Sequence, residues 1–309
     1  MTKETVVVTA ASIHADAVEM LGNYKVVFAD VRAGEDALAE LCAKEQPVAI
    51  MVRYGNISRK VISASKKLRI IAKHGVGTDN IDKQAASDLD IPVTAALGSN
   101  SQAVAEHTLG LMFACARMIG WLDARMREGH WDKDNYLGIE LAGRTLGLIG
   151  AGSIGGRVAQ VALALGMQVL INDPYAKAES LPVGAKLSEL ESLLKASNVV
   201  SLHCPLTPST RNLLNTERLA MLPDQCIVIN TARAGLFDEA AMLKELESKR
   251  LHAGIDCFQD EPLGDNSPWL TAPNTILTPH IGGTTANAFR QMGVMAADSI
   301  LQHLQVVNV

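Results

Sequence analysis

Short apolar runs rich in β-branched residues alternate with segments of helical periodicity through the N-terminal third of the chain. The apolar runs are ETVVVT, YKVVFA, AIMV, LRIIAKHGVG and IPVTAAL, and helical spacing covers residues 14–21 and 35–42. Strands that alternate with helices are typical of βαβ units, in which the strands run parallel. The pattern therefore predicts an open parallel sheet in this part of the chain.

A long segment of helical spacing separates this sheet from a second series. The segment begins at Ser101, a residue type that favours helix starts, and continues to Gly129. The alternation then restarts, with the apolar runs TLGLIG, QVLIND, NVVSLH, CIVINT and LHAGID and with helical spacing at residues 154–165, 188–195 and 239–248. Residues 284–309 predict a last amphipathic helix that runs back onto the first domain. We therefore expect two open α/β sheets in series.

Composition agrees with a two-domain globular protein. The 309 residues exceed the usual size of a single core, and 48% of them are hydrophobic and 20% charged. The net charge of -5 and the absence of a Lys/Arg-rich block argue against nucleic acid as a partner. The start MTKETVVVTA lacks the features of a signal peptide, and no long uncharged apolar run follows, so we expect a cytoplasmic protein without a membrane partner.

Cysteine and histidine spacing gives no sign of disulfides or metal. The cysteines are Cys42, Cys115, Cys204, Cys226 and Cys257, an odd number with no C-x-x-C pair. Buried free thiols are the expected state, and His203 beside Cys204 does not match the spacing of zinc ligands. We predict no metal site.

A glycine-rich turn follows the apolar run TLGLIG. Gly150, Gly152 and Gly155 have G-x-G-x-x-G spacing between a predicted strand and a predicted helix, the context of a dinucleotide-binding loop. Asp173 ends the next strand, 18 residues after the last of these glycines (173 - 155), where a ribose-binding carboxylate is expected. An ordinary turn followed by a strand-end aspartate is the alternative, but the order of strand, glycines, helix and acid favours a site for NAD rather than NADP.

Three later strands each precede a reactive side chain. Arg233 follows CIVINT, Glu261 follows LHAGID, and His280 follows the run TIL. Ligands of open α/β sheets bind at the carboxyl ends of strands, so these side chains are candidates for one site. Taken singly, each is more typical of a solvated or structural residue.

The chain resembles the D-isomer-specific 2-hydroxyacid dehydrogenases, especially the phosphoglycerate and hydroxypyruvate dehydrogenase branch. The matching segments, in family order, are HGVGTDNID at 74–82, SNSQAVAEH at 99–107, GAGSIG, HCPLT at 203–207, NTARAG, DCFQDEP at 256–262 and TPHIGG at 278–283. The resemblance implies a Rossmann-type NAD-binding domain, residues 100–284, inserted in a flavodoxin-like substrate domain, residues 1–99 and 285–309. Because the chain ends at residue 309, the extra regulatory domain of longer phosphoglycerate dehydrogenases is expected to be absent.

The resemblance implies Arg233 as the substrate anchor, His280 as the acid/base and Glu261 as its partner. The chemistry of these residue types agrees, because imidazole titrates near neutrality and can give a proton to the carbonyl oxygen while hydride reaches the carbon. A carboxylate on the other ring nitrogen would orient the ring and stabilise its charged form. A guanidinium offers a planar fork for the substrate carboxylate.

The resemblance also implies residues that line the ligands. The expected cofactor residues are Gly150, Gly152, Ser153, Ile154, Gly155, Asp173, Cys204, Pro205, Thr231, Ala232, Arg233, Asp256, His280 and Gly282, with Asp256 at the nicotinamide carboxamide. The expected substrate residues are Arg53, Val76, Gly77, Asn100, Arg233 and His280. Gly75 and Gly77 could instead mark a plain strand-to-helix turn. Ala234, where the family often has glycine, and ALGSN at 96–100 depart from the family pattern.

Arg53 bears on the identity of the substrate. It matches an arginine that phosphoglycerate dehydrogenases aim at the distal anion, so a second acidic group such as phosphate or sulfonate is expected on the substrate, with a solvated arginine as the alternative. The resemblance further implies a homodimer joined through the cofactor domains, with the helix that begins near Ser101. An alternative of another class is an NAD-sensing binding protein, because the C-terminal-binding-protein corepressors share the fold and the three reactive residues.

Overall fold

The computed structural model describes residues 3–306, which divide into two compact units. Unit 1 comprises residues 1–100 and 283–309, and unit 2 comprises residues 101–282. The chain thus leaves unit 1 after Asn100 and returns at Gly283. The predicted boundaries, after residues 99 and 284, lie one residue before the first crossover and two residues after the second.

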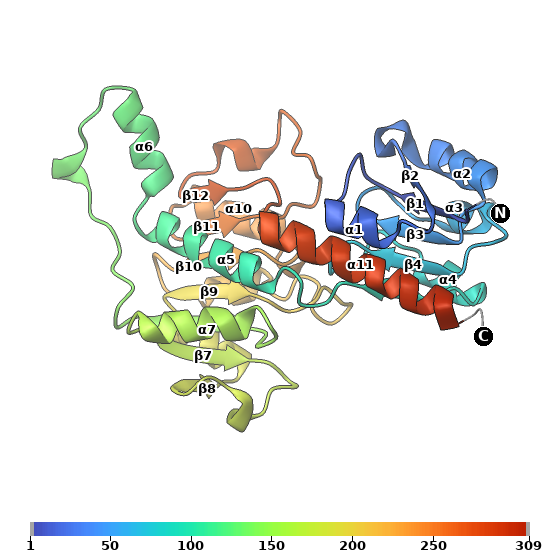
Figure 1. Ribbon diagram of the computed structural model, residues 1–309. Coiled ribbons are helices and arrows are strands. Elements are labelled where there is room, and N and C mark those ends of the chain that lie inside the picture. The colour runs from blue at the N-terminus through green and yellow to red at the C-terminus, as the bar shows by residue number, and fades with distance from the viewer. Residues whose placement is uncertain (1–2, 307–309) are drawn as a thin grey trace. The chain divides into compact units, whose positions relative to one another are not determined.

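Unit 1 is built on a five-stranded parallel sheet with the order β2-β1-β3-β4-β5 (Figure 1). Its strands are β1 (Thr5–Val8), β2 (Lys25–Phe28), β3 (Ala49–Val52), β4 (Ile70–Lys73) and β5 (Val93–Ala95). The order 2-1-3-4-5 is that of flavodoxin-like sheets, which confirms the fold predicted for this unit.

Helices cover both faces of this sheet. They are α1 (Ala15–Met20), α2 (Gly34–Glu45), α3 (Arg59–Ala64), α4 (Lys83–Asp88) and α11 (Ala286–Val306). Val7 packs with buried residues of α2, α3 and α4, whereas its neighbours Val6 and Val8 pack with residues of α1 and α11. Successive side chains of a strand point to opposite faces, so a continuous apolar strand serves two cores. The C-terminal helix predicted to return to the first domain is α11, and residues 307–309 of that prediction lie outside the described part.

Unit 2 is built on a seven-stranded parallel sheet with the order β12-β11-β10-β9-β6-β7-β8. Its strands are β6 (Thr145–Ile149), β7 (Gln168–Asn172), β8 (Ala185–Leu187), β9 (Val199–Leu202), β10 (Ile227–Asn230), β11 (His252–Ile255) and β12 (Thr275–Leu277). Counted from β6, this is the 3-2-1-4-5-6 order of a Rossmann sheet with one more strand at the edge. The predicted Rossmann-type domain is confirmed.

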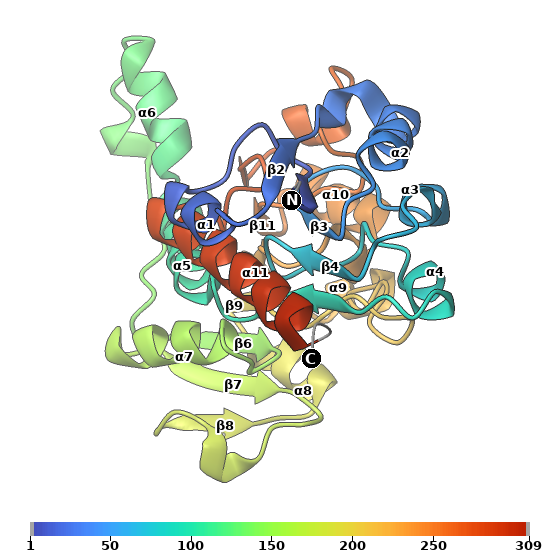
Figure 2. The ribbon, with the colours of Figure 1, turned by 45° about the vertical axis from the view of Figure 1, so that its right-hand side comes forward.

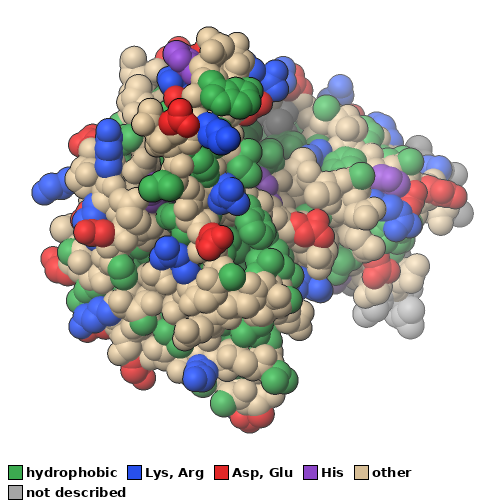
Figure 3. Space-filling model, turned by 90° about the vertical axis from the view of Figure 1, so that its left-hand side faces the viewer, with side chains coloured by type: hydrophobic (Ala, Val, Ile, Leu, Met, Phe, Trp, Pro, Cys, Tyr) green, Lys and Arg blue, Asp and Glu red, His purple; other side chains and the backbone are tan. Residues whose placement is uncertain are grey.

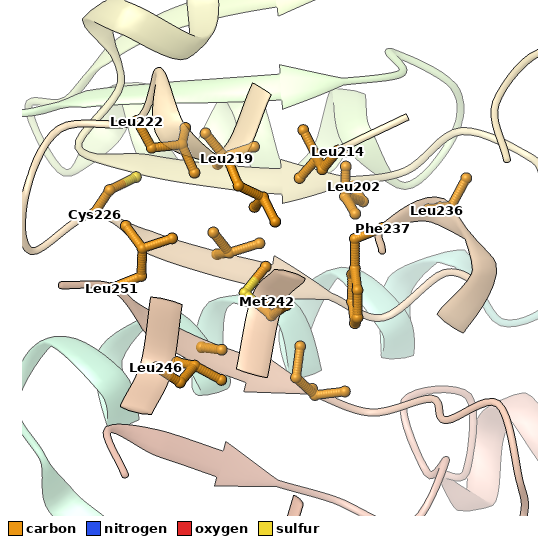
Figure 4. Packing of buried hydrophobic residues seen from close by; sticks show 14 of the residues in the cluster. Leu202, Leu214, Leu219, Leu222, Cys226, Leu236, Phe237, Met242, Leu246 and Leu251 are labelled. Carbon is orange, nitrogen blue, oxygen red and sulfur yellow. The ribbon is translucent and has the colours of Figure 1, made fainter. Parts of the chain in front are cut away.

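The helices of unit 2 also form two layers. They are α5 (Ser101–Ala116), α6 (Ile119–Arg127), α7 (Gly155–Ala164), α8 (Leu190–Ala196), α9 (Thr216–Ala220) and α10 (Glu239–Glu247). Figure 4 shows Leu219 of α9 with Met242 and Leu246 of α10 in the cluster that covers one face of the sheet. Met112 of α5 and Val158 of α7 belong to the cluster on the other face. Both layers leave the carboxyl ends of the strands to loops.

The single long helix predicted over residues 101–129 is wrong, because two helices occupy this segment. Met118 between them is left-handed, with φ 49° and ψ 35°. The backbone N–H of Ile139 donates to Ala116 O at 2.8 Å, and the Tyr136 hydroxyl donates to Arg117 O at 2.7 Å. These donors take carbonyls that a continuing helix would use, so α5 ends there.

Residues 117–140, here called the arm, carry α6 away from the sheet of unit 2 (Figures 1 and 2). No residue of α6 is buried. Its side chains therefore contribute nothing to either core of the unit, and the stability of so short a helix must come from elsewhere.

Other predictions concern thiols, metal and membrane. All five cysteines are free, and four are buried, with Cys204 half-buried. Burial raises the pKa of Cys115, Cys226 and Cys257 to about 12, so these thiols stay protonated. Among residues 3–306 there is no group of three or more His, Cys, Asp or Glu side chains that could hold a metal ion. Within the same range, every helix is too short or too polar to span a bilayer.

Candidate active site

The glycine loop connects β6 to α7 at the point where the strand order of unit 2 reverses. Gly150 has φ 100°, and a Cβ there would lie 2.8 Å from the carbonyl of His203, which follows β9. A Cβ on Gly155 would lie 2.1 Å from Gly150 O, so neither position tolerates a side chain. At Gly152 no atom lies within 4 Å of the Cβ position. The loop therefore needs two glycines for its own packing, and the third leaves space for a ligand to approach the backbone.

Asp173 lies directly after β7 and braces the same loop. Its Oδ2 accepts a hydrogen bond from the N–H of Ala151 at 2.8 Å, and its Oδ1 accepts one from the N–H of Tyr175 at 2.9 Å. The carboxylate is half-buried, and each oxygen can accept a second hydrogen bond. Together with the open side of Gly152, this donor and acceptor set fits the ribose and pyrophosphate of NAD. The individual cofactor contacts stay predictions.

The remaining predicted cofactor residues of unit 2 follow neighbouring strands. Ser153 and Ile154 belong to the glycine loop, Cys204 and Pro205 follow β9, and Thr231 and Ala232 follow β10. Ser153 Oγ lies 2.8 Å from Ser101 Oγ, and Thr231 Oγ1 lies 2.8 Å from Thr108 Oγ1 on α5. Sequence reasoning did not single out Ser101 or Thr108 for these contacts, because the packing of α5 against the loops is set by tertiary structure.

The three candidate catalytic residues follow three adjacent strands. In the register of the sheet Asn230 of β10 pairs with Ile255 of β11, which pairs with Leu277 of β12. Arg233, Glu261 and His280 come three, six and three residues after these strand ends. Parallel neighbouring strands end at one edge, so the topology brings all three residues to the same edge of unit 2.

Glu261 and His280 form a hydrogen-bonded pair. Nδ1 of His280 lies 2.8 Å from Oε2 and 3.0 Å from Oε1 of Glu261. An ionised carboxylate only accepts hydrogen bonds, so Nδ1 carries the proton and Nε2 is the ring atom that can exchange one with a ligand. The side chain of His280 is 46% exposed and that of Glu261 is 37% exposed, so a substrate can reach the imidazole ring.

Both members of the pair are held by backbone. The N–H of Phe258 donates to Oε1 of Glu261 at 2.9 Å. His280 adopts the left-handed region at φ 53°, which a residue other than glycine adopts only when its surroundings hold it there. An apolar pocket of about 450 Å³ flanks the pair and is lined by Phe258, Glu261, Pro262, Leu263, Leu270, Leu277, Thr278, Pro279 and His280. Apolar surroundings on this side strengthen the attraction between carboxylate and imidazolium.

Asp256 holds the loop that carries His280. Its carboxylate is 1% exposed and accepts hydrogen bonds from the N–H of Ile281 at 2.9 Å on Oδ1 and of Gly282 at 2.8 Å on Oδ2. A Cβ on Gly282 would lie 2.9 Å from Oδ2, so glycine permits this close approach. The predicted contact of Asp256 with the nicotinamide carboxamide stays a prediction, and in the fold the carboxylate serves the loop.

Arg233 is positioned by the end of β10. The fully buried Asn230 donates from Nδ2 to Arg233 O at 2.8 Å and accepts from the N–H of Ala232 at 3.0 Å. Nη1 of Arg233 donates to Ala232 O at 2.7 Å. Asn230 therefore fixes the turn from which the guanidinium projects. Sequence reasoning missed this residue, although an asparagine that ends the apolar run CIVIN was a visible signal of a buried polar contact.

The predicted substrate residues Arg53, Val76, Gly77 and Asn100 belong to unit 1. The guanidinium carbon of Arg53 lies 4.7 Å from the ring centroid of Tyr54 and 4.7 Å from that of Phe289 on α11. Val76 is 37% exposed in the loop after β4, in which Gly75 has φ 143°. Oδ1 of Asn100 is buried without a hydrogen-bond partner among the described residues. Contact of these residues with a substrate stays a prediction.

Comparison with known proteins gives consistent matches. Residues 109–282 match the family model described as "D-isomer specific 2-hydroxyacid dehydrogenase, NAD binding domain". The chain is 41% identical to hydroxypyruvate reductase of Thermotoga maritima over 265 residues. This alignment covers 85% of this chain and 86% of that protein. It is 38% identical over 296 residues to D-3-phosphoglycerate dehydrogenase of Methanocaldococcus jannaschii, covering 95% of this chain and 56% of the relative.

A solved structure, the TT0316 protein from Thermus thermophilus, is 34% identical and has a TM-score of 0.87, with 98% of this chain and 97% of that chain covered. The chain spans about half the length of the phosphoglycerate dehydrogenases that it matches. The predicted family and the predicted NAD-binding domain within unit 2 are confirmed.

Proposed function

Because the chain belongs to the D-isomer-specific 2-hydroxyacid dehydrogenase family, we propose that it interconverts a small 2-hydroxy acid and its 2-oxo acid with His280 as acid/base. The observation that carries this role is the 2.8 Å contact between Nδ1 of His280 and Oε2 of Glu261 at the strand edge that also bears Arg233. A carboxylate on one ring nitrogen and a partly exposed second nitrogen are what a proton donor for a carbonyl oxygen needs.

Each residue has a separate task in this proposal. NADH, when bound to the glycine loop, supplies the hydride for reduction. His280 gives the proton from Nε2 to the oxygen of the substrate, and Glu261 stabilises the imidazolium before that transfer and fixes the ring. Arg233 holds the carboxylate of the 2-oxo acid with its planar fork and withdraws electron density from the neighbouring carbonyl. In the oxidative direction His280 takes the hydroxyl proton instead.

We further propose a substrate with a second acidic group, such as 3-phosphoglycerate or another 2-hydroxy acid with two acidic groups. Hydroxypyruvate and glyoxylate, which have one carboxylate, are the alternative candidates. The guanidinium carbon of Arg53 lies 4.7 Å from the ring centroids of both Tyr54 and Phe289. Stacking restricts the guanidinium while its N–H edges keep their donor capacity, which suits an anion. The similarity to a hydroxypyruvate reductase and to phosphoglycerate dehydrogenases is compatible with either class.

The experiment that tests this function measures NADH and NADPH oxidation with glyoxylate, pyruvate, hydroxypyruvate, phosphohydroxypyruvate and sulfopyruvate. Turnover with NADH that is lost in His280→Ala, while NADH still binds, supports the proposal. NADH binding without turnover of any of these acids, combined with capture of a protein partner that depends on NADH, would support the NAD-sensing binding protein instead.

We also propose a homodimer formed through unit 2, with the arm covered by the second copy. The arm exposes a set of large apolar side chains, namely Ile119 54%, Trp121 46%, Met126 52%, Trp131 75% and Leu137 96%. Figure 3, which views the molecule from the side on which α6 lies in Figure 1, shows hydrophobic side chains at the surface among scattered charged ones. Such a concentration of exposed aromatic and aliphatic surface is typical of an interface.

Light scattering coupled to size-exclusion chromatography tests the dimer. Trp121→Glu is expected to give a monomer, and Val183→Glu, at a 99% exposed residue of unit 2 outside the arm, is the matched control and should stay dimeric. A wild-type chain that is monomeric at micromolar concentration would contradict the dimer without affecting the proposed chemistry.

A further inference from the structure

His107 lies on α5, outside the residues that carry the proposed chemistry, yet it contacts the loop that bears His280. Its Nε2 lies 2.9 Å from Thr278 Oγ1 and 3.3 Å from Asp256 Oδ1. The side chain is 21% exposed, and both of these contacts are with residues of its own unit. His107 is the last residue of the motif SNSQAVAEH, and no role was predicted for it from the sequence.

The hydrogen bonds around Thr278 determine which way the contact with His107 runs. The Thr278 hydroxyl donates to Asp256 Oδ1 at 2.6 Å. A hydroxyl has one proton, so Thr278 can only accept from the imidazole, and Nε2 of His107 must carry hydrogen. Nε2 of His107 also lies 3.3 Å from Asp256 Oδ1, which accepts hydrogen bonds from the Thr278 hydroxyl and from the backbone N–H of Ile281. His107 therefore adds a further N–H to the donors around this buried carboxylate.

This carboxylate connects α5 with the backbone next to His280. Burial raises the pKa of Asp256, but hydrogen bonds from two side chains and two backbone N–H groups outweigh it and keep the pKa below its ordinary value. The ionised acid then holds the N–H groups of Ile281 and Gly282. Loss of one donor from a buried carboxylate weakens the remaining arrangement, because the charge becomes less compensated.

We propose that His107 is a positioning residue, which fixes the Thr278–Gly282 loop through Thr278 and Asp256 and thereby sets the place of the His280 ring. The inference rests on the proposed function for its effect on turnover, whereas its effect on the loop is independent of any activity. Displacement of a catalytic group by about 1 Å can cost about a hundredfold in rate, so a support of this kind affects kcat more than the binding of cofactor.

The test compares three variants of the full chain. His107→Phe keeps a ring of similar size and removes the N–H, and His107→Gln places an amide N–H near the position of Nε2. His252→Phe is the matched control, because His252 is a buried histidine of the same unit whose Nε2 contacts Gln225 Oε1 at 2.9 Å, and it begins the strand that Asp256 follows. The measurements are kcat and KM for NADH and 2-oxo acid, and amide hydrogen exchange of residue 278 and residues 280–283.

His107→Phe is expected to lower kcat about 10- to 100-fold with KM for NADH within about threefold, and to speed exchange at residues 281 and 282 about tenfold or more. His107→Gln should restore most of both, and His252→Phe should alter neither. Exchange in His107→Phe equal to that of the wild type would overturn the inference, as would equal exchange in the Gln and Phe variants. If the wild type reduces no 2-oxo acid, the proposed function fails, and hydrogen exchange still decides whether His107 holds the loop.

Discussion

Nδ1 of His280 lies 2.8 Å from Oε2 and 3.0 Å from Oε1 of Glu261, so one ring nitrogen is committed to the carboxylate. The two residues are 19 apart in the chain and follow neighbouring strands, β11 and β12. In the proposed mechanism this contact makes the two side chains one functional group, in which the carboxylate acts on the substrate through the imidazole.

Glu261→Gln and His280→Gln are therefore expected to be non-additive. His280→Gln should lower kcat/KM for reduction by about 10² to 10⁴, the usual contribution of a general acid, and Glu261→Gln by less. The double variant should be no slower than His280→Gln alone, since removing the acid leaves Glu261 nothing to act on. Steady-state kinetics on the four proteins, with NADH affinity from fluorescence titration as the control, measure this. Losses that multiply would show that Glu261 acts on the substrate directly.

The glycine loop separates packing from ligand binding. Gly155→Ala is expected to destabilise unit 2, since its Cβ would lie 2.1 Å from Gly150 O. Gly152→Ala should leave the melting temperature nearly unchanged, because no atom lies within 4 Å of the new Cβ, and should weaken NADH binding about tenfold or more.

Thermal unfolding and NADH titration of both variants measure the difference. Gly264→Ala is the matched control, since it also has open space around its Cβ and lies outside the loop. Unchanged NADH affinity in Gly152→Ala would contradict the assignment of this glycine to the cofactor.

His74, at the carboxyl end of β4, predicts acid sensitivity in unit 1. The residue is 3% exposed, neither ring nitrogen has a hydrogen-bond partner among the described residues, and its ring packs against Phe289 at 5.3 Å. Burial lowers the pKa of His74 from 6.5 to about 4, with Arg53 and Lys73 adding to the effect. The folded protein thus keeps this histidine neutral where the unfolded chain would protonate it.

The sign of the pH dependence follows from that direction. Well above pH 6.5 the imidazole is neutral in both states and contributes no pH dependence. Between pH 6.5 and about 4 only the unfolded chain binds the proton, so stability falls as the pH falls, by a total of about 3 kcal/mol. In His74→Leu the free energy of unfolding of unit 1 should therefore fall less between pH 7 and pH 4 than in the wild type. Urea titrations monitored by hydrogen exchange in unit 1 measure this difference. His303→Leu, at a half-buried histidine of α11, is the control, and identical pH dependence in wild type and His74→Leu would refute the prediction.

The sequence was sufficient for both sheets because most of their central strands are buried on two faces. Runs such as TVVV and AIMV are wholly buried, so apolar continuity located them, whereas β8 (Ala185–Leu187) at the sheet edge is short and exposed and was not predicted. The pair of Glu261 and His280 followed from motifs, since each residue lies at a strand end whose neighbours the topology fixes.

Elements that depend on distant partners were not predictable in the same way. The break at Met118 exists because Ile139 and Tyr136 supply donors from a segment about twenty residues further on. Helical periodicity reports which side chains can be buried, and it contains no information on such competing hydrogen bonds. The support of Asp256 by His107 is of the same kind, because α5 must first pack against β11 and β12.

Arg53 provides the prediction that separates substrate classes. Arg53→Ala should raise KM for phosphohydroxypyruvate or sulfopyruvate about 10- to 100-fold, the equivalent of one lost charge-assisted hydrogen bond, and should leave KM for pyruvate and glyoxylate within about twofold. Arg53→Lys should be intermediate, because lysine keeps the charge but lacks the planar guanidinium that packs on the rings of Tyr54 and Phe289. Arg32→Ala, an exposed arginine of the same unit, controls for the general loss of one positive charge. Equal KM changes for acids with one and with two acidic groups would show that Arg53 does not bind the distal group, and the acid/base assignment of His280 would be unaffected.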